Sequence, residues 1–311
     1  MIDIVLATYN GERFLNEQIC SIQACDGYNA LINRFIIIDN GSTDGTLKLV
    51  ELHQQRDSKI ELHLNQSGKT GVQENFSAGL MLTNSEYIML SDQDDVWLKD
   101  KIVLSFNKLK ALEKNAKKEQ PILVFTDKKI VDEQLNTLND SDYEISKLPK
   151  DWHLQTKQLL QRNVASGCTM LFNRQLLNKA MPLPNEAFMH DWWFALIASY
   201  YGVIALVDKP LILYRQHNSN LIGSPKRSYW SLMLNAKASY NLFKINFNKA
   251  MIQAKHFEKV THQKYQFAAL TDFSAFKVLH LVLFKNITQS GVIRKLSITY
   301  LLLKRRLVAK N

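Results

Sequence analysis

The sequence predicts an α/β protein with a mostly parallel sheet flanked by helices, followed by a basic helical extension. Three observations support this fold class. Short β-rich runs alternate with helix-period segments in the first half, unusual polar loops follow several of these runs, and the net charge changes sign near residue 225. Strand, helix and strand in repetition imply right-handed crossovers and a doubly wound sheet.

The first half of the chain contains five runs that we interpret as strands. Several are continuously apolar, which is typical of strands buried on both faces of a parallel sheet. The runs are DIVLAT (3–8), RFIIID (34–39), KIELHL (59–64), EYIMLS (86–91) and PILVFT (121–126). Helix-period segments are expected over 12–24, 46–55, 71–83 and 98–117.

The second half continues with fewer and less regular elements. Residues 136–155 are polar and show no periodicity. We expect a strand at ASGCTMLFN (165–173), a helix at FMHDWWFALIASYYG (188–202) and two short strands around Pro210 in VIALVDKPLILYRQH (203–217).

A change of composition separates residues 1–225 from residues 226–311. The second range holds 16 Lys and Arg against Glu258 and Asp272, a net charge of +14, whereas the first range has a net charge of −4. Apolar residues recur there at helical spacing between basic ones: Phe276, Leu279, Leu283, Leu296, Leu303 and Leu307. We therefore predict a catalytic α/β domain over 1–225 and a helical, basic, amphipathic region over 226–311.

Cysteine content and hydropathy limit the class of protein. Three cysteines without CxxC spacing are expected to be reduced thiols, with no disulfide framework or zinc site. No leader pattern opens the chain, and the longest uncharged apolar runs are shorter than the roughly 18 residues that a spanning helix needs. We therefore expect a cytoplasmic protein.

Polar loops follow three of the predicted strands. They are TYNGE (8–12), DNGSTDGT (39–46) and DQDD (92–95). Ligands of doubly wound sheets bind at the carboxyl ends of the strands, so these loops are expected to form a ligand site. Carboxylates such as Asp92, Asp94 and Asp95 suit a hard divalent cation, Mg²⁺ or Mn²⁺, shared with substrate phosphates. The alternative is a solvated turn before a helix N-terminus.

Six motifs resemble those of one enzyme family. LATYNGERFLNEQICSI, IIIDNGSTDGTLKLV and YIMLSDQDDVWLKDK resemble the nucleotide-sugar half of family 2 glycosyltransferases of the GT-A type. RNVASGCTMLFNR, MHDWWFALIASYYG and PLILYRQHNSN resemble its bacterial rhamnosyltransferase branch. The resemblance covers roughly residues 1–224 and implies a GT-A (Rossmann-like) catalytic domain.

The resemblance implies a donor site at the first strand ends. Its residues are Ala7, Thr8, Tyr9, Asn10, Glu12, Asp39, Lys69, Asn75 and Asp92. Tyr9 would stack on the base unless it is a core aromatic, and Asp39 would accept from a pyrimidine imide, which favours a UDP- or dTDP-linked sugar. Asn40 stands where the family usually has a second acid. Lys69 would lie near the diphosphate unless it is solvated.

The resemblance also implies a metal site, a base and an acceptor contact. Asp92, Asp94 and His217 would hold Mn²⁺ or Mg²⁺, although a lone histidine is also compatible with a structural role. Asp95 either ligates the metal or caps the next helix. Asp191 would deprotonate the acceptor hydroxyl, a step worth roughly 10²–10⁴-fold. Its alternative is a helix-capping acid.

Next to this base, Trp192 would offer an apolar face to the acceptor sugar, whereas Trp193 is expected in the core.

Other classes fit less well. The first loop lacks the GxGxxG of dinucleotide enzymes, and no GxxxxGK[ST] of P-loop NTPases is present. A sugar nucleotidyltransferase normally carries a glycine-rich basic loop at the first strand. A non-catalytic nucleotide- or sugar-binding module is disfavoured because Asp39, Asp92, Asp94 and Asp191 are all present. No base-reading motif indicates nucleic acid.

The function expected from these observations is transfer of a sugar, with inversion, from a nucleoside diphosphate to a saccharide or lipid-linked glycan. L-rhamnose is one candidate sugar, and cell-surface polysaccharide such as O-antigen is the expected product. The basic region is expected to hold the enzyme peripherally on the inner face of the cell membrane, because anionic lipid attracts such segments. The sequence does not indicate an oligomeric state.

Overall fold

The computed structural model describes residues 1–147, 149–217 and 236–271. The described residues fall into two compact units. Unit 1 takes its residues from Met1–Gln155, Val164–Pro184 and Met189–Pro225, and unit 2 from Thr156–Asn163, Asn185–Phe188 and Lys226–Asn311. Each unit is described separately below.

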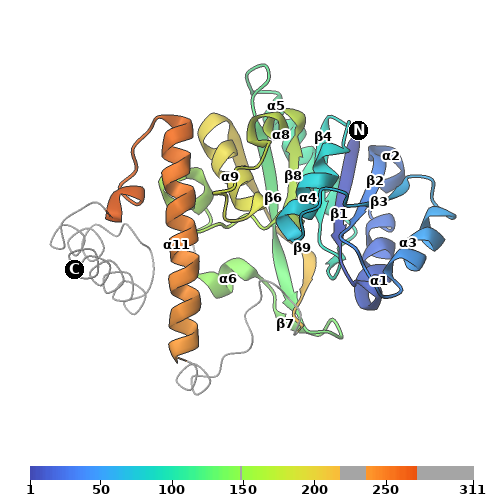
Figure 1. Cartoon of the computed structure of the whole chain (residues 1–311). Helices are drawn as coiled ribbons and strands as arrows, with labels where there is room; N and C mark the ends of the chain where they lie inside the picture. The colour runs from blue at the N-terminus through green and yellow to red at the C-terminus, as the bar shows by residue number, and fades with distance from the viewer. Residues whose placement is uncertain (148, 218–235, 272–311) are drawn as a thin grey trace. The chain divides into compact units, whose positions relative to one another are not determined.

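Unit 1 is built on one sheet whose first half is parallel (Figure 1). This half consists of β3 (Ile60–Leu64), β2 (Ile32–Asp39), β1 (Ile2–Thr8) and β4 (Tyr87–Ser91), in that spatial order. Ala7 pairs with Ile38 and Leu6 with Ser91, so these strands end at one edge of the sheet. The polar loops predicted to bind the ligand start from this edge.

The second half of the sheet is mixed. The order continues with β8 (Met170–Asn173), β6 (Ile122–Val131), β9 (Val203–Arg215) and β5 (Val96–Trp97), and β7 (Thr137–Asn139) pairs with β6. β8 is antiparallel to both β4 and β6, whereas β9 is parallel to β6. The α/β fold class is confirmed, and the antiparallel strands lie in this half.

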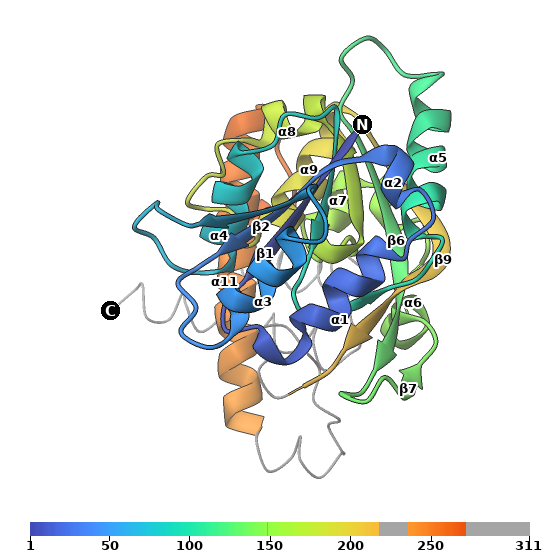
Figure 2. The ribbon, with the colours of Figure 1, turned by 90° about the vertical axis from the view of Figure 1, so that its right-hand side faces the viewer.

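Helices cover both faces of the sheet (Figure 2). On one face α1 (Glu12–Gln23), α3 (Thr46–Gln54) and α5 (Lys101–Glu113) share a core with alternate strand residues such as Ile4 and Phe35. On the other face α4 (Val72–Met81), α8 (Arg174–Ala180) and α9 (His190–Tyr201) pack together. Because both faces are covered, β1 and β4 are buried almost throughout, which explains their continuous apolar sequences.

Short elements complete unit 1: α2 (Tyr28–Leu31), α6 (Asp142–Ser146) and the 3₁₀ helices η1 (Trp152–Leu154) and η2 (Gly167–Thr169). Two expectations differ from the structure. The strand predicted at 165–173 begins only at Met170, because η2 occupies its first part.

The two strands predicted around Pro210 form a single strand, β9. Pro210 pairs with Asp127 at a register shift between β9 and β6, the kind of irregularity at which strands tolerate proline.

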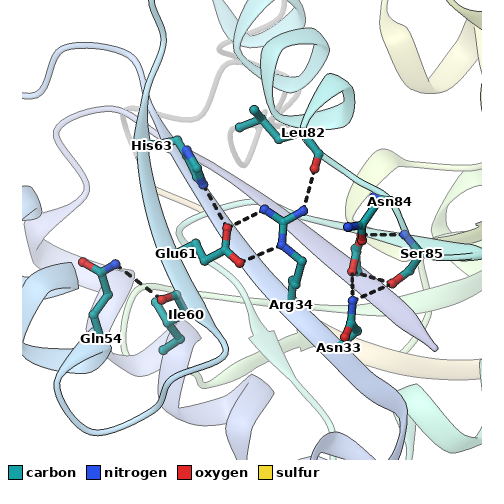
Figure 3. Close-up of polar contacts among 10 residues, drawn as sticks. Asn33, Arg34, Gln54, Ile60, Glu61, His63, Leu82, Asn84 and Ser85 are labelled. Carbon is teal, nitrogen blue, oxygen red and sulfur yellow. Dashed lines mark hydrogen bonds and ion pairs between the residues drawn. The ribbon is translucent and has the colours of Figure 1, made fainter.

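A polar network ties the strand ends opposite the ligand edge (Figure 3). Arg34 donates to both oxygens of Glu61, from Nε at 2.6 Å, and to the carbonyl of Leu82 at 2.6 Å. The Nε2 of His63 lies 3.1 Å from the same carboxylate. These bonds join β2, β3 and the end of α4, and they hold the pKa of Glu61 down at about 2, chiefly through Arg34.

Unit 2 contains α7 (Thr156–Leu159), the long α11 (Ala236–Thr261) and η3 (Ala268–Thr271). Its interior includes Phe247, Phe257 and Phe267, and the amide of Phe188 donates to Gln253 Oε1 at 2.8 Å. The apolar positions predicted from Phe276 onward lie outside the described residues. Among the helices that the structure describes, none is long and apolar enough to cross a membrane.

Candidate active site

Two polar loops after β1 and β2 are joined by hydrogen bonds. Asn10 has a left-handed backbone (φ 47°), a conformation that asparagine tolerates better than most residues. Its amide donates to Ser42 Oγ at 2.8 Å, and its side-chain oxygen accepts from the amide of Thr43 at 2.9 Å. The loop carrying Asn10 is therefore held in a fixed conformation by the loop after Asp39.

Asp39 closes β2 and is fully buried. Its Oδ1 accepts from the amides of Gly41 (2.9 Å) and Ser42 (2.8 Å), and its Oδ2 accepts from the Ser42 hydroxyl. The acid predicted to recognise the base is thus a buried acceptor at the ligand edge, held in place by its own loop.

Gln93 connects the first loop to the acidic loop. Its Oε1 accepts from Thr8 Oγ1 (2.7 Å) and the Tyr9 amide (2.9 Å), and its Nε2 donates to the Tyr9 carbonyl (3.2 Å). Tyr9 is 54% exposed, so it is not a core aromatic. Its ring therefore remains available for stacking.

Three predicted donor residues have other or weaker roles in this structure. Asn75 is buried and donates to the carbonyls of Thr8 (3.2 Å) and Ile38 (2.9 Å), so it fastens α4 to two strand ends. Glu12 accepts from the amide of Gly45 at 2.9 Å. Lys69 is exposed. Contact of these three with a donor stays a prediction.

The acidic loop after β4 forms a compact cluster with a thiol. One ligand atom from each of Asp92, Asp95 and Cys168 lies within 4.8 Å of the others. Asp95 and Cys168 are buried, and Asp95 Oδ2 has no hydrogen-bond partner among the described residues. Of the two roles expected for Asp95, capping of the next helix is not supported, because Asp100 occupies the N-cap position of α5, and metal ligation stays a prediction.

Burial is the main reason why the acids of this cluster are perturbed. It raises the pKa of Asp92 to about 7, with further contributions from the charges of Asp94 and Asp191. Burial and the charges of Asp94 and Asp92 also raise the pKa of Asp95 well above its usual range. Crowded carboxylates with an unpartnered oxygen fit a divalent cation, because its positive charge offsets both their lost hydration and their mutual repulsion.

Asp94 lies beside the histidine that was predicted to join it. His217 Nε2 donates to Asp94 Oδ2 at 2.8 Å, and the side chains are 8% and 20% exposed respectively. With its Nε2 proton directed at the carboxylate, His217 orients Asp94. The structure therefore brings Asp94 and His217 together, and the third predicted metal residue, Asp92, lies in the cluster with Asp95 and Cys168.

Arg215, at the end of β9, binds the acidic loop. Its amide donates to Asp95 Oδ1 (3.3 Å), its Nε donates to the Asp94 carbonyl (2.9 Å), and its guanidinium pairs with Glu17. Its Cζ also lies 4.6 Å from the centre of the Phe14 ring. Sequence analysis did not single out Arg215, because its role depends on where β9 places it.

Asp191 lies in the first turn of α9, and its carboxylate is held by two amides. Gly167 donates to Oδ2 at 3.0 Å, and Trp192 donates to Oδ1 at 2.6 Å. Gly167, which binds Asp191, directly precedes Cys168 of the acid cluster, so the predicted base lies near that cluster. Met189 occupies the N-cap position of α9, but Asp191 accepts from the first-turn amide of Trp192, so its roles as base and as helix-capping acid both stay predictions.

The two tryptophans after Asp191 are largely buried. Trp193 donates from Nε1 to the carbonyl of Ala180 at 3.1 Å and is a core residue, as predicted. Trp192 is 8% exposed, so little of its ring faces solvent, and its predicted acceptor contact stays a prediction. His190 is also buried and lies over Phe76 at 4.3 Å between ring centres.

Lys128 is a further member of the site that sequence analysis did not identify. Its Nζ donates to Ser166 Oγ at 2.8 Å and lies 4.1 Å from the centre of the Tyr214 ring. Its positive charge acts on both Asp92 and Asp95. Lys128 lies in the strand run ILVFTDKKIV, whose local sequence gives no signal of a functional role, so only the sheet pairing reveals it.

Comparison with known proteins identifies the family and the fold. The family model described as Glycosyl transferase family 2 matches residues 3–180, more than half of the chain. The dTDP-rhamnosyl transferase RfbG of Shigella flexneri is 30% identical over 227 residues, covering 70% of this chain and 74% of the relative.

A second relative, from Campylobacter jejuni, is the GalNAc(5)-diNAcBac-PP-undecaprenol beta-1,3-glucosyltransferase. It is 27% identical over 299 residues, which cover 92% of this chain and 88% of the relative.

Two solved structures share the fold. The mannosyltransferase PcManGT from Pyrobaculum calidifontis, in complex with GDP-Man and Mn²⁺, has a TM-score of 0.56 and 17% identity, covering 100% of this chain and 80% of that one. TarS 1–349 of S. aureus, in complex with UDP-GlcNAc, has a TM-score of 0.53 and 16% identity, covering 90% and 78%.

Proposed function

Because this chain belongs to glycosyltransferase family 2, we propose that it transfers a sugar from a nucleoside diphosphate to a saccharide hydroxyl in one inverting displacement. The observation that carries this proposal is the meeting of two groups of residues at one edge of the sheet. Donor-side acids follow β4, the predicted base opens α9, and Asp191 is bonded to Gly167, the neighbour of Cys168 in the acid cluster.

On the donor side, the loops after β1 and β2 bind the nucleotide. The exposed ring of Tyr9 stacks on the base, and the buried carboxylate of Asp39 accepts the imide N–H of uracil or thymine. Cytosine has no such N–H and would be rejected, since an unpaired buried acceptor costs about 1–3 kcal/mol. A UDP- or dTDP-linked sugar is therefore the proposed donor.

Asp92, Asp94 and His217 are the residues proposed to hold Mn²⁺ or Mg²⁺, with Asp95 and Cys168 adjacent. The ion, when bound, neutralises charge that develops on the leaving diphosphate. The protein supplies oxygen ligands, and His217 orients Asp94 through the 2.8 Å bond. The raised pKa of Asp92 supports this assignment, because an opposing cation would relieve the crowding.

Asp191 is proposed to take the proton of the acceptor hydroxyl as that oxygen attacks the anomeric carbon. The amides of Gly167 and Trp192 fix the carboxylate, so it does not need to reorient during the reaction. Attack opposite the leaving nucleotide inverts the configuration at the anomeric carbon. Removal of the proton by a positioned base is worth roughly 10²–10⁴-fold.

The relatives guide the choice of sugar and acceptor. The Shigella relative is named as a dTDP-rhamnosyl transferase and the Campylobacter relative as an enzyme acting on an undecaprenol-linked glycan. We propose L-rhamnose from dTDP-rhamnose as the first donor to test and a lipid-linked saccharide as acceptor, in cell-surface polysaccharide such as O-antigen. The enzyme would then act in the cytoplasm, at the inner face of the membrane.

A panel of UDP-, dTDP- and GDP-linked sugars tests the activity. Release of nucleoside diphosphate is measured with saccharide acceptors, in Mn²⁺, in Mg²⁺ and in excess EDTA. We expect release of dTDP or UDP that depends on acceptor and divalent ion. Formation of pyrophosphate from a nucleoside triphosphate and a sugar phosphate would instead identify a nucleotidyltransferase, and binding without release would identify a non-catalytic module.

The basic region over 226–311 is proposed to dock on anionic lipid, since each Lys or Arg near such a surface contributes about 1 kcal/mol. Liposome flotation tests this. The full chain should bind anionic vesicles and be released by salt. If it ignores them at low ionic strength, the region serves packing or assembly.

A further inference from the structure

Lys128 is a cation placed inside an acidic site. It lies on β6, and its side chain is 12% exposed. The ammonium donates to Ser166 Oγ at 2.8 Å, faces the ring of Tyr214 at 4.1 Å and lies 3.9 Å from Asp142 Oδ2. A lysine with this little exposure needs compensation for its lost hydration, and carboxylates nearby provide it.

Asp142 is the carboxylate paired with Lys128, and the acid cluster adds further negative charge. The positive charge of Lys128 stabilises the charged forms of Asp92, Asp95 and Cys168. Lys128 is thus a resident cation of the pocket, and it must repel any divalent ion that binds the same carboxylates. This repulsion is a measurable property, which a residue that only fills space would not have.

Ser166 links Lys128 to the proposed base. The Ser166 carbonyl accepts from the amide of Thr169 (2.9 Å) and from its hydroxyl (2.6 Å), which closes the tight turn that leads into β8. The next residue, Gly167, donates its amide to Asp191 Oδ2 at 3.0 Å. Lys128 therefore binds the side chain of Ser166, and the backbone of the next residue, Gly167, binds Asp191.

We infer that Lys128 is a positioning residue of the active site, which fixes the Ser166–Gly167 turn behind Asp191 and adds a positive charge near the acid cluster. This inference rests on the proposed glycosyltransferase function. It predicts two effects of opposite sign when the charge is removed. Turnover falls because Asp191 is no longer fixed, whereas the divalent ion binds more tightly because a repulsive charge has gone.

Four variants separate these effects. For Lys128→Met we expect kcat to fall by about tenfold or more and the dissociation constant of Mn²⁺ to decrease by about three- to tenfold. Ser166→Ala keeps the charge, so it should lower kcat but leave Mn²⁺ affinity unchanged. The double variant should lose no more turnover than Lys128→Met alone, because both changes break one link. Lys128→Arg should retain wild-type Mn²⁺ affinity and recover part of the turnover.

Lys129→Met is the matched control. Lys129 is the next residue on β6, and its Nζ pairs with Asp140 at 2.7 Å instead of entering the site. Both kcat and Mn²⁺ affinity should be unchanged in this variant. Circular dichroism and thermal melting show which variants fold. If Lys128→Met does not fold, Ser166→Ala and Lys128→Arg provide the test.

Mn²⁺ affinity is measured by electron paramagnetic resonance in the absence of substrate, so it does not depend on activity. Weaker or unchanged Mn²⁺ binding in folded Lys128→Met would overturn the inference, and so would additive losses in the double variant. Absence of transfer by the wild-type protein with every donor would contradict the proposed function instead, while leaving the affinity measurement interpretable.

Discussion

His217 Nε2 lies 2.8 Å from Asp94 Oδ2, although 123 positions separate the two residues. The contact exists because β5, directly after the acidic loop, pairs with β9, and because Arg215 at the end of β9 binds the backbone of Asp94. Phe14, whose ring centre lies 5.0 Å from that of His217, packs against the same segment. The acidic loop is therefore fixed from the far end of the sheet.

Asp94→Asn should remove most Mn²⁺-dependent transfer, because it neutralises a proposed ligand. His217→Ala should weaken Mn²⁺ binding by about 10- to 100-fold, because it removes a residue that is proposed to hold the ion and that also orients Asp94. Mn²⁺ titration and initial rates measure both. Asp208→Asn is the control, since Asp208 is an exposed acid paired with Lys150. Full activity of Asp94→Asn in excess EDTA would disprove the metal assignment.

Gly167→Ala should reduce transfer while the protein stays folded. A Cβ at this position would lie 2.9 Å from His190 Nε2 and 3.5 Å from the Cβ of Asp191. His190 is buried against Phe76 and has little room to move, so the start of α9 must shift. A displacement of about 1 Å at the base can cost about 10²-fold. Unchanged kcat would show that Asp191 does not depend on this turn.

Glu61→Gln should destabilise the fold at neutral pH but not in strong acid. The pKa of Glu61 is lowered to about 2, mainly by Arg34. A lowered carboxyl pKa contributes stability above the unfolded value of about 4.3, and this contribution is lost as the pH falls towards 2.

Urea unfolding measures the difference between wild type and Glu61→Gln. We expect about 1 kcal/mol at pH 7, because the pair is partly exposed, and a shrinking difference below pH 4. A difference that is constant with pH would show that the ion pair with Arg34 is not its source.

Lys101→Met tests a second buried cation. Lys101 is fully buried under the acid cluster, with its Nζ 4.4 Å from the centre of the Trp97 ring, and burial lowers its pKa to about 8. The charged form costs stability below pH 8, and this cost is relieved as the pH rises towards the unfolded value of about 10.4. Between pH 8 and 10 the free energy of unfolding of the wild-type protein should therefore increase relative to that of Lys101→Met.

Denaturant unfolding at pH 7, 8.5 and 10 measures this change. The variant should be at least as stable as the wild type at pH 7, since an apolar side chain of similar length replaces an incompletely paired charge. A loss of several kcal/mol at pH 7 would mean that Lys101 stabilises Asp95 and Cys168 by its charge.

The parts of the fold that depend on local pattern were predictable from sequence. Buried apolar runs predicted β1, β2 and β4, and the polar residues after these strands indicated Asp39 and the acidic loop as parts of the site. The uninterrupted β9 was missed because Pro210 normally ends a strand, and the register shift that accommodates it depends on β6.

The remaining site residues depend on long-range pairing. Lys128, Cys168 and Arg215 are ordinary residues in strands and turns, and nothing in their neighbouring sequence distinguishes them. They reach Asp92 and Asp95 only because β6, η2 and β9 end near the acidic loop. Local periodicity carries no information about such contacts.

Asp191→Asn, compared with the wild type for donor binding and for transfer in the same preparation, tests whether the proposed base acts as one. The donor pocket consists of other loops, so the dissociation constant of the nucleotide sugar should change by less than about threefold. Transfer should fall by about 10²–10⁴-fold, because the amide cannot accept the acceptor's proton. A variant that loses donor binding but keeps its turnover per bound donor would show that Asp191 is structural, and the proposed mechanism would be wrong.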